Sequence, residues 1–158
     1  MKLLAFLLSA ILLLSSCKKD QTTSIHPSSF VFGWCHCYLC MTPEASFEYY
    51  EIKNGAVYPD SMNNFPGVVP LVFATIPLSN SKYQLAAALI SSFPQYLQNN
   101  PNQTFGTINC NTSSAVHIEY TENGQLKTWD IDQDTANQPI AIRAYVAQMD
   151  SVFQQLIQ

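Results

Sequence analysis

Four cysteines are the residues in this sequence best suited to chemistry. Three stand within the segment Trp34-Cys35-His36-Cys37-Tyr38-Leu39-Cys40-Met41, and the fourth is Cys110. Thiols at such spacings can form disulfides, hold a soft metal ion or exchange disulfides with other proteins. Which of these is expected depends on the compartment in which the chain folds.

Disulfide formation is the default for an exported chain with an even number of thiols. Two disulfides would use Cys35, Cys37, Cys40 and Cys110, and the sequence leaves the three possible pairings open. Cys35 and Cys37 share a face if the strand before them continues, and positions two apart rarely bridge each other. We therefore expect at least one disulfide to join the cluster to Cys110.

Soft-metal binding is the first alternative for these cysteines. Cys, His and Met in one short segment suit zinc or cuprous copper, with His36 among the candidate ligands and Cys110 completing a tetrahedral set. A zinc site usually has two separated ligand pairs, whereas Cys110 stands alone. Thiol redox chemistry at Cys37-Tyr38-Leu39-Cys40 is the second alternative, although no thioredoxin-like strand and helix pattern surrounds it.

The first residues have the order of a secretory signal peptide. Lys2 supplies a positive charge, and residues 3–14 form an apolar run of twelve interrupted only by Ser9. Twelve residues are too few for the roughly 20 that span a bilayer, and no later segment is long enough. We expect residues 1–16 to be removed and the mature chain to have no membrane-spanning segment.

The signal ends in Leu14-Ser15-Ser16-Cys17, which resembles the lipobox of bacterial lipoproteins. In that family the cysteine thiol is alkylated with diacylglycerol, the peptide is cut before the cysteine, and the new amino terminus is usually acylated. The resemblance implies that Cys17 is the lipidated residue and that this lipid anchors the protein to a membrane. Two or three chains anchor firmly, because each buried methylene contributes about 0.8 kcal/mol.

The mature chain of 142 residues has the size of one ordinary domain. It carries six Lys and Arg against eleven Asp and Glu, a net charge of −5, and no basic stripe. Nucleic acid is therefore not an expected partner. Charged residues make up only 11% of the chain, while Asn and Gln number 23. Such an amide-rich surface steers charged ligands poorly and favours a peptide, protein or glycan partner.

A polar tether over residues 17–29 is expected to precede a single domain over residues 30–158. Aromatic and β-branched residues at 30–34 predict its first strand. Two Asn-Gly pairs, Asn54-Gly55 and Asn123-Gly124, predict type I′ hairpins, because both turn positions need a positive φ. Each turn is expected to join two strands of the domain into a hairpin.

Each Asn-Gly turn also predicts a register. Counting outward from the first turn places Ile52 opposite Val57 on an apolar face. Counting from the second places Ile118 opposite Trp129 on the apolar face, and His117 opposite Asp130 on the other face. The alternation of apolar and polar residues selects the same register independently.

The remaining elements are one strand and two helical segments. Residues 71–76 predict a buried strand. Apolar residues at helical spacing from about Ser81 predict a middle helix that Pro94 breaks or restarts. The stripe over residues 142–156 predicts an amphipathic C-terminal helix. The expected fold class is α+β, an antiparallel sheet built from two Asn-Gly hairpins and packed against a middle helix and a C-terminal amphipathic helix.

Two further patterns offer weaker chemistry. His117, Asp130 and the nearby Ser113 and Ser114 include the residue types of a serine triad, but no Gly-x-Ser-x-Gly elbow accompanies them. A cross-strand His-Asp pair explains the first two without catalysis. Asp130-Ile131-Asp132-Gln133-Asp134 opens like a calcium loop but lacks the later Gly and Glu ligand positions, so we expect a solvated turn.

Cys17-Lys18-Lys19-Asp20 resembles the start of many lipoproteins of Bacteroidota, in which charged residues after the cysteine often accompany outer-membrane or surface placement. The domain is similar to small uncharacterised lipoproteins of that group, which have an early cysteine pair, a Tyr-rich hairpin, and a Cys-Pro-Asp-Cys segment before a late hairpin and terminal helix. The matching segments are 35–40, 49–58 and 119–131. Asn109-Cys110-Asn111-Thr112 departs from the pattern, with one cysteine in place of two.

The same resemblance implies O-glycosylation. These bacteria modify exported proteins at Asp followed by Ser or Thr and then a small or aliphatic residue. Asp60-Ser61-Met62 and Asp134-Thr135-Ala136 match that motif in expected loops. Ser61 and Thr135 are therefore the candidate sites, and Thr135 is the stronger of the two.

These observations together predict a lipid-anchored envelope lipoprotein, placed at the outer membrane on its periplasmic or surface face. Its domain is expected to be a non-enzymatic binding or structural domain without a cofactor. The alternative is a lipoprotein that binds zinc or copper, or carries out thiol redox chemistry, through Cys35, Cys37, Cys40 and Cys110.

Overall fold

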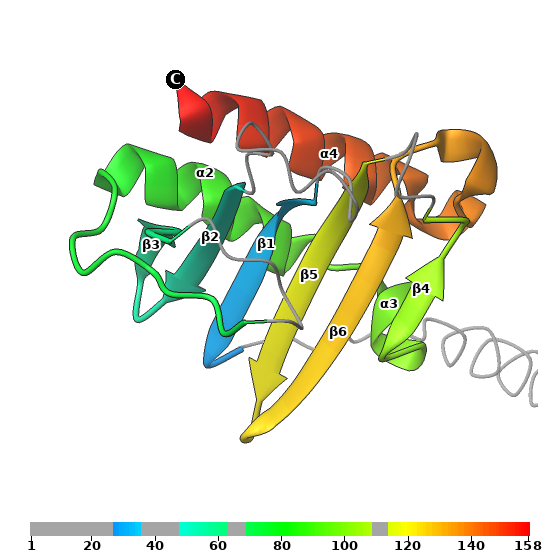
Figure 1. Ribbon diagram of the computed structural model, residues 1–158, viewed down its shortest axis with the longest axis horizontal. Helices are drawn as coiled ribbons and strands as arrows, with labels where there is room; N and C mark the ends of the chain where they lie inside the picture. Colours follow the sequence, from blue (N-terminus) through cyan, green and yellow to red (C-terminus); the bar gives the residue numbers. More distant parts are fainter. Residues whose placement is uncertain (1–26, 36–47, 63–68, 109–113) are drawn as a thin grey trace, which may run out of the picture.

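A six-stranded sheet in the order β3-β2-β1-β5-β6-β4 forms the centre of the computed structural model, which describes residues 27–35, 48–62, 69–108 and 114–158, with the helices on one side (Figure 1). The strands are β1 (Ser29–Cys35), β2 (Glu48–Lys53), β3 (Ala56–Pro59), β4 (Gln103–Phe105), β5 (Ala115–Glu122) and β6 (Gln125–Asp132). The helices are α2 (Asn80–Ser91), α3 (Gln95–Asn99), the short 3-10 helix η1 (Thr135–Asn137) and α4 (Ile140–Ile157). The expected α+β fold class is confirmed.

Both Asn-Gly hairpins are present with the predicted registers. Their turn residues all have positive φ: Asn54 (51°), Gly55 (74°), Asn123 (52°) and Gly124 (75°). These left-handed conformations are those of type I′ turns. Ile52 lies opposite Val57 in the first hairpin, and His117 lies opposite Asp130 in the second. The turn chemistry therefore sets which side chains reach each face of the sheet.

β1 lies between the two hairpins and joins them into one sheet. It pairs antiparallel with β2 on one side and with β5 on the other, so that Gly33 is opposite both Tyr49 and His117. Ser28 extends this pairing, because its backbone nitrogen and its Oγ lie 2.8 and 3.0 Å from the carbonyl oxygen of Thr121. The described domain thus begins within the last residues of the expected tether.

The core lies between the sheet and the helices. Alternate residues of β1 point into it, and Phe30, Phe32 and Trp34 are all buried. Phe93 packs on Trp129 with ring centroids 5.3 Å apart. The predicted amphipathic helix is confirmed as α4, whose buried residues are Ile142, Tyr145, Val146, Met149, Val152, Phe153 and Leu156. Within the described ranges, no helix is long and apolar enough to cross a membrane.

Pro94 separates α2 from α3, as the sequence predicts. Proline has no N–H to donate within a helix and its ring clashes with the preceding turn. The nitrogen of Ser92 makes the last bond of α2, to the carbonyl oxygen of Ala88 at 3.0 Å, and α3 begins directly after Pro94. The bend buries Phe93 in the core and leaves Tyr96 on the surface. Residues 92–96, which we call the α2–α3 corner, lie beside α4.

β4 is the other edge of the sheet and runs parallel to β6. Two hydrogen bonds hold the chain before β4 against β6. The backbone nitrogen of Thr128 donates to Oδ1 of Asn102 at 3.0 Å, and the indole nitrogen of Trp129 donates to the carbonyl oxygen of Asn100 at 2.7 Å. These two hydrogen bonds therefore hold β4 beside β6 in addition to the backbone pairing of the two strands.

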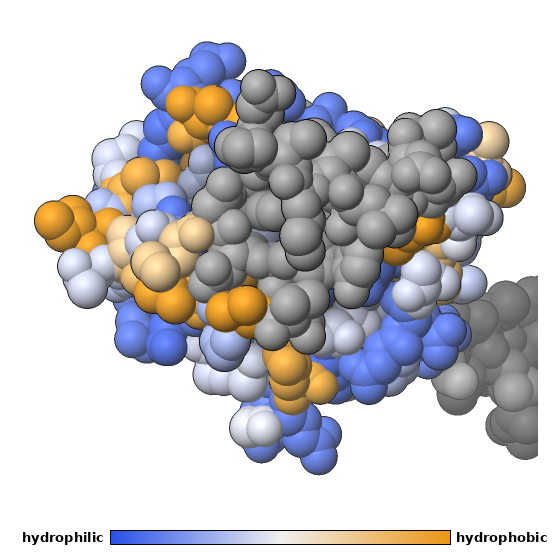
Figure 2. All heavy atoms as spheres, in the orientation of Figure 1, coloured by the Kyte–Doolittle hydropathy of each residue, from blue (hydrophilic) through white to orange (hydrophobic). Residues whose placement is uncertain are grey.

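The prediction of a buried strand at residues 71–76 is wrong. Only an isolated bridge between Phe73 and Asp60 forms there, while Ile76 is 78% exposed and Val72 45% exposed. Pro70 and Pro77 flank the run, and proline lacks the N–H that a ladder needs. The segment instead runs along the edge of β3, and Figure 2 shows hydrophobic atoms gathered over this edge.

Candidate functional site

Four residues form a row across four strands on the sheet face opposite the helices. Tyr49 of β2, Gly33 of β1, His117 of β5 and Asp130 of β6 are successive cross-strand partners. A Cβ on Gly33 would lie 2.5 Å from Cδ1 of Tyr49, so the tyrosine ring occupies the space that any other residue would fill. The ring thereby reaches the imidazole of His117, with centroids 6.0 Å apart and planes at 88°.

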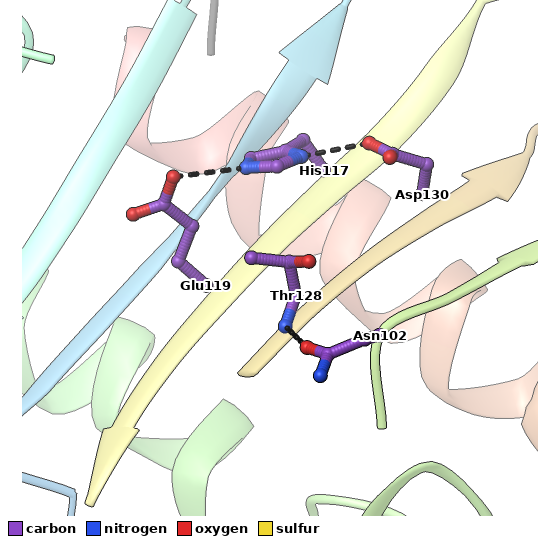
Figure 3. A network of polar contacts seen from close by, with 5 residues as sticks. All are labelled: Asn102, His117, Glu119, Thr128 and Asp130. Atoms are coloured by element: carbon purple, nitrogen blue, oxygen red, sulfur yellow. Dashed lines mark hydrogen bonds and ion pairs between the residues drawn. The ribbon is translucent and has the colours of Figure 1, made fainter. Parts of the chain in front are cut away.

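His117 is held by two carboxylates (Figure 3). Its Nδ1 lies 2.7 Å from Oδ1 of Asp130, and its Nε2 lies 3.2 Å from Oε1 of Glu119. Burial alone would lower the pKa of His117, because its side chain is only 9% exposed. The hydrogen bonds and negative charges of Asp130 and Glu119 outweigh burial and raise this pKa to about 9. The imidazole is therefore protonated at neutral pH and donates from both nitrogens.

This geometry does not fit the serine triad that the residue types suggest. In a triad, the His nitrogen that faces the nucleophile must accept a proton. Here Nε2 of His117 faces Glu119 instead, and Nδ1 faces Asp130, as in a triad. Ser113 lies outside the described residues. The predicted cross-strand His-Asp pair is confirmed, and the two carboxylates form an ion network around the buried imidazole that ties β5 to β6.

Asp132 forms a second polar cluster, at the end of β6. The prediction of a solvated turn is wrong for this residue, because Asp132 is buried. Its carboxylate accepts hydrogen bonds from the nitrogen of Thr107 at 3.1 Å, the nitrogen of Asp134 at 2.9 Å and Nδ2 of Asn137 at 2.8 Å. Through these bonds the Asp132 carboxylate joins the loop after β4 to η1. Its role is therefore structural, and it is not arranged to bind calcium.

The cysteine cluster lies almost entirely outside the described residues. His36, Cys37, Cys40 and Cys110 are not described, and the backbone of Cys35 ends β1 in register with Ala115. In the described part of the chain, no group of three or more His, Cys, Asp or Glu is arranged to hold a metal ion. The expected disulfides and the zinc or copper alternative stay predictions.

The two candidate O-glycosylation sites are both exposed. Ser61 follows β3, and its Oγ donates to the carbonyl oxygen of Val72 at 2.8 Å. Thr135 begins η1, where the side chain of Asp134 caps the turn by accepting from the nitrogen of Ala136 at 2.9 Å. The hydroxyl of Thr135 has no such bond to a described residue, which keeps it the stronger candidate.

A groove of about 460 Å³ lies between the α2–α3 corner and α4. We call it the helix groove, and its lining residues are Ser92, Pro94, Gln95, Tyr96, Ala141, Ala144, Tyr145 and Gln148. None of these side chains is charged. Its volume lies within the range of about 300–1,000 Å³ that is usual for small-ligand sites. The helix groove is therefore a concave surface whose size and uncharged lining suit an uncharged ligand.

Comparison with protein families, with curated proteins and with solved structures found no match to this chain. The similarity to small lipoproteins of Bacteroidota stays an interpretation of the residues quoted above. The helix groove was not predicted, because its walls come from segments about 45 residues apart that carry no shared motif. The contact of Glu119 with His117 was also not predicted, although residues two apart on a strand share a face.

Proposed function

We propose that this chain is a lipid-anchored lipoprotein of the cell envelope whose single domain binds another molecule without catalysing a reaction. The observation that carries the proposal is the segment Leu14-Ser15-Ser16-Cys17 at the end of an apolar run of signal-peptide length. Lipidation of Cys17 would place the domain at a membrane surface, most simply that of the outer membrane.

The start of the fold is compatible with such an anchor. β1 begins at Ser29, twelve residues after Cys17. Twelve residues span at most about 40 Å, so a lipid on Cys17 would hold the domain close to the membrane. The domain would then act on molecules that reach that surface.

The hydrogen bonding of His117 and the uncharged lining of the helix groove favour binding over catalysis. Among the described residues, His117 is buried, and both of its ring nitrogens are hydrogen-bonded to carboxylates. A general base must have a nitrogen or oxygen ready to accept a proton at the working pH. The helix groove offers no charged side chain, which suits recognition of a neutral molecule.

A soft-metal or thiol-redox role is the second candidate function. The register of β1 and β5 favours it, because Cys35 is opposite Ala115, and Cys110 precedes Ala115 by only five residues. Cys35 and Ala115 therefore lie at the same end of the sheet, while the other three cysteines lie outside the described residues. Either a disulfide or a shared metal ion could use this proximity.

Metabolic labelling with radioactive palmitate tests the anchor. The wild-type protein is expected to take up label and to lose residues 1–16. Cys17→Ala should take up no label and remain at precursor length, because alkylation of the thiol precedes cleavage. Ser16→Ala is the matched control, since it keeps a small residue beside the cysteine, and it should be labelled normally. Label on Cys17→Ala, or none on wild type, would remove the proposal.

A further inference from the structure

The helix groove combines an aromatic lining with an absence of charge. Tyr96 is 38% exposed and stands on the α3 side, while Tyr145 is buried on α4. The hydroxyl of Tyr145 donates to the carbonyl oxygen of Leu89 at 3.2 Å, so this residue offers the groove only its ring. The small side chains of Ala141 and Ala144 leave space between α3 and α4. The groove therefore presents apolar ring surface to whatever enters it.

Two amide groups supply hydrogen-bonding capacity to the same groove. Oγ of Ser92 lies 2.9 Å from Oε1 of Gln148 and 2.8 Å from the carbonyl oxygen of Ala88, so its single hydrogen is shared between these two acceptors. Nε2 of Gln148 bonds to no described residue and can donate to a ligand. Nε2 of Gln95 donates to Oδ1 of Asn99 at 3.0 Å, which leaves its Oε1 as an acceptor. Among the described residues, no side chain or backbone group bonds to either of these two atoms. The groove thus offers one donor group and one acceptor.

We propose that the helix groove binds a neutral saccharide. Each sugar hydroxyl both donates and accepts, so neighbouring hydroxyls can satisfy Nε2 of Gln148 and Oε1 of Gln95 together. The apolar C–H face of a sugar ring packs well on an aromatic ring such as that of Tyr96. This inference rests on the proposed binding function and adds the chemical class of the ligand.

Two other classes of ligand fit the groove less well. A charged ligand would lose water without gaining an opposite charge, because the lining is uncharged. A proline-rich peptide also favours aromatic grooves, but proline carbonyls only accept hydrogen bonds and proline has no N–H. Such a peptide supplies no donor to Oε1 of Gln95, which is exposed and would keep water as its partner, so the peptide gains nothing from this group.

The test uses the full-length mature lipoprotein in micelles of a detergent without a sugar headgroup. An array of neutral and acidic glycans, together with a decaproline peptide, is probed with this protein, and each ligand found is titrated by calorimetry. Saturable binding of a neutral glycan is expected, with no preference for acidic ones. Tyr96→Ala should weaken that affinity by about threefold to tenfold, as loss of one aromatic contact implies.

Two pairs of α4 variants separate the groove from the rest of the surface. Ala144→Glu places a carboxylate in the groove and should weaken binding by about tenfold or more. Ala147→Glu adds the same charge at an exposed position outside the lining and should leave the affinity unchanged. Gln148→Leu should weaken binding, whereas Gln155→Leu, two helical turns further on, should not.

The outcomes distinguish the ligand class from the proposed function. Failure of every neutral glycan to bind, or equal affinity of wild type and Ala144→Glu, would overturn the saccharide proposal. Decaproline binding that is lost in Ala144→Glu would replace saccharide by peptide and leave the binding function standing. Absence of any ligand together with normal palmitate labelling would overturn the saccharide and the binding role while leaving the anchor.

Discussion

The ring of Tyr49 meets the imidazole of His117 at 88° with centroids 6.0 Å apart, although β1 runs between their two strands. The contact depends on Gly33, the residue that stands opposite both of them. Because Gly33 has no side chain, the tyrosine ring can lie over β1 and help bury the protonated imidazole. One glycine in the first strand therefore couples the two hairpins on the face opposite the core.

Gly33→Ala is expected to destabilise the fold by about 2–3 kcal/mol, because the added Cβ overlaps Tyr49 and the carbonyl oxygen of Glu48. Gly55→Ala is the control: its Cβ would meet nothing within 4 Å, but its positive φ should cost about 1 kcal/mol. Urea unfolding of both variants measures the difference. Equal stability of Gly33→Ala and wild type would show that Tyr49 can move aside without loss.

Stability should fall as the pH rises from neutral toward 9. The pKa of His117 is about 9 in the folded protein, above its ordinary value of 6.5, so the folded state holds this proton more tightly. The stabilisation is complete below about pH 6.5 and is lost as the pH passes through 9. It amounts to about 2 kcal/mol once screening of the half-exposed Asp130 carboxylate is taken into account.

Urea midpoints at pH 6 and above pH 9 check this linkage. His117→Gln keeps a donor toward Asp130 but cannot titrate, so its stability should change less between the two pH values than that of wild type. The difference between the two proteins isolates His117 from every other group that titrates in this window. An equal change in the urea midpoint of wild type and His117→Gln would show that groups other than His117 cause the pH dependence.

The two carboxylates should contribute unequally to the pKa of His117. Asp130 makes the shorter contact, 2.7 Å against 3.2 Å for Glu119. Asp130→Asn should therefore lower the pKa of His117 more than Glu119→Gln does, because each variant removes one charge and keeps the side-chain shape. Titration of the imidazole resonances by NMR measures both effects. A larger drop in Glu119→Gln would contradict the order of the distances.

Asp132→Ala should destabilise the protein by about 3 kcal/mol, because it leaves three hydrogen-bond donors without their shared acceptor in a buried site. Asp134→Ala is the neighbouring control, since the exposed side chain of Asp134 accepts one hydrogen bond, from the nitrogen of Ala136, and its loss should cost about 1 kcal/mol. Thermal unfolding followed by circular dichroism compares them. Similar losses of stability in the two variants would mean that the buried hydrogen bonds of Asp132 contribute no more than the single exposed bond of Asp134.

Local signals in the sequence were sufficient for the hairpins and for α4. Asn54-Gly55 and Asn123-Gly124 set the registers because few residue pairs tolerate two positive φ angles, and the apolar alternation agreed with each turn. The stripe of α4 was evident because seven apolar residues repeat at the helical period. In both cases the information lies within about 20 consecutive residues.

Features that depend on distant segments were not predictable in this way. The place of β1 between the hairpins follows from strand pairing across the chain, which leaves no local pattern. The apolar run at 71–76 resembled a strand because composition alone cannot show that Pro70 and Pro77 keep it out of the sheet. The helix groove likewise arises only when the corner at Pro94 meets α4.

The register of β1 and β5 brings Cys35 and Ala115, the strand residues nearest the cysteine cluster and Cys110 in the chain, opposite each other. Cys35 is in register with Ala115, and Cys110 lies five residues before Ala115 in the chain. Five residues reach at most about 17 Å, and Cys37 and Cys40 follow Cys35 by two and five residues. A disulfide from the cluster to Cys110 is therefore compatible with the length of the intervening chain.

If the chain is exported as proposed, we predict two disulfides among Cys35, Cys37, Cys40 and Cys110, with at least one reaching Cys110. Such a bond closes a loop of about 70 residues, which the chain-entropy model values at about 4 kcal/mol. Cys110→Ala should therefore lower the melting temperature of the oxidised protein by about 10 °C or more, whereas the reduced forms of variant and wild type should melt alike. Four titratable thiols in the denatured, unreduced protein, with stoichiometric zinc or copper in the native form, would instead establish the metal site.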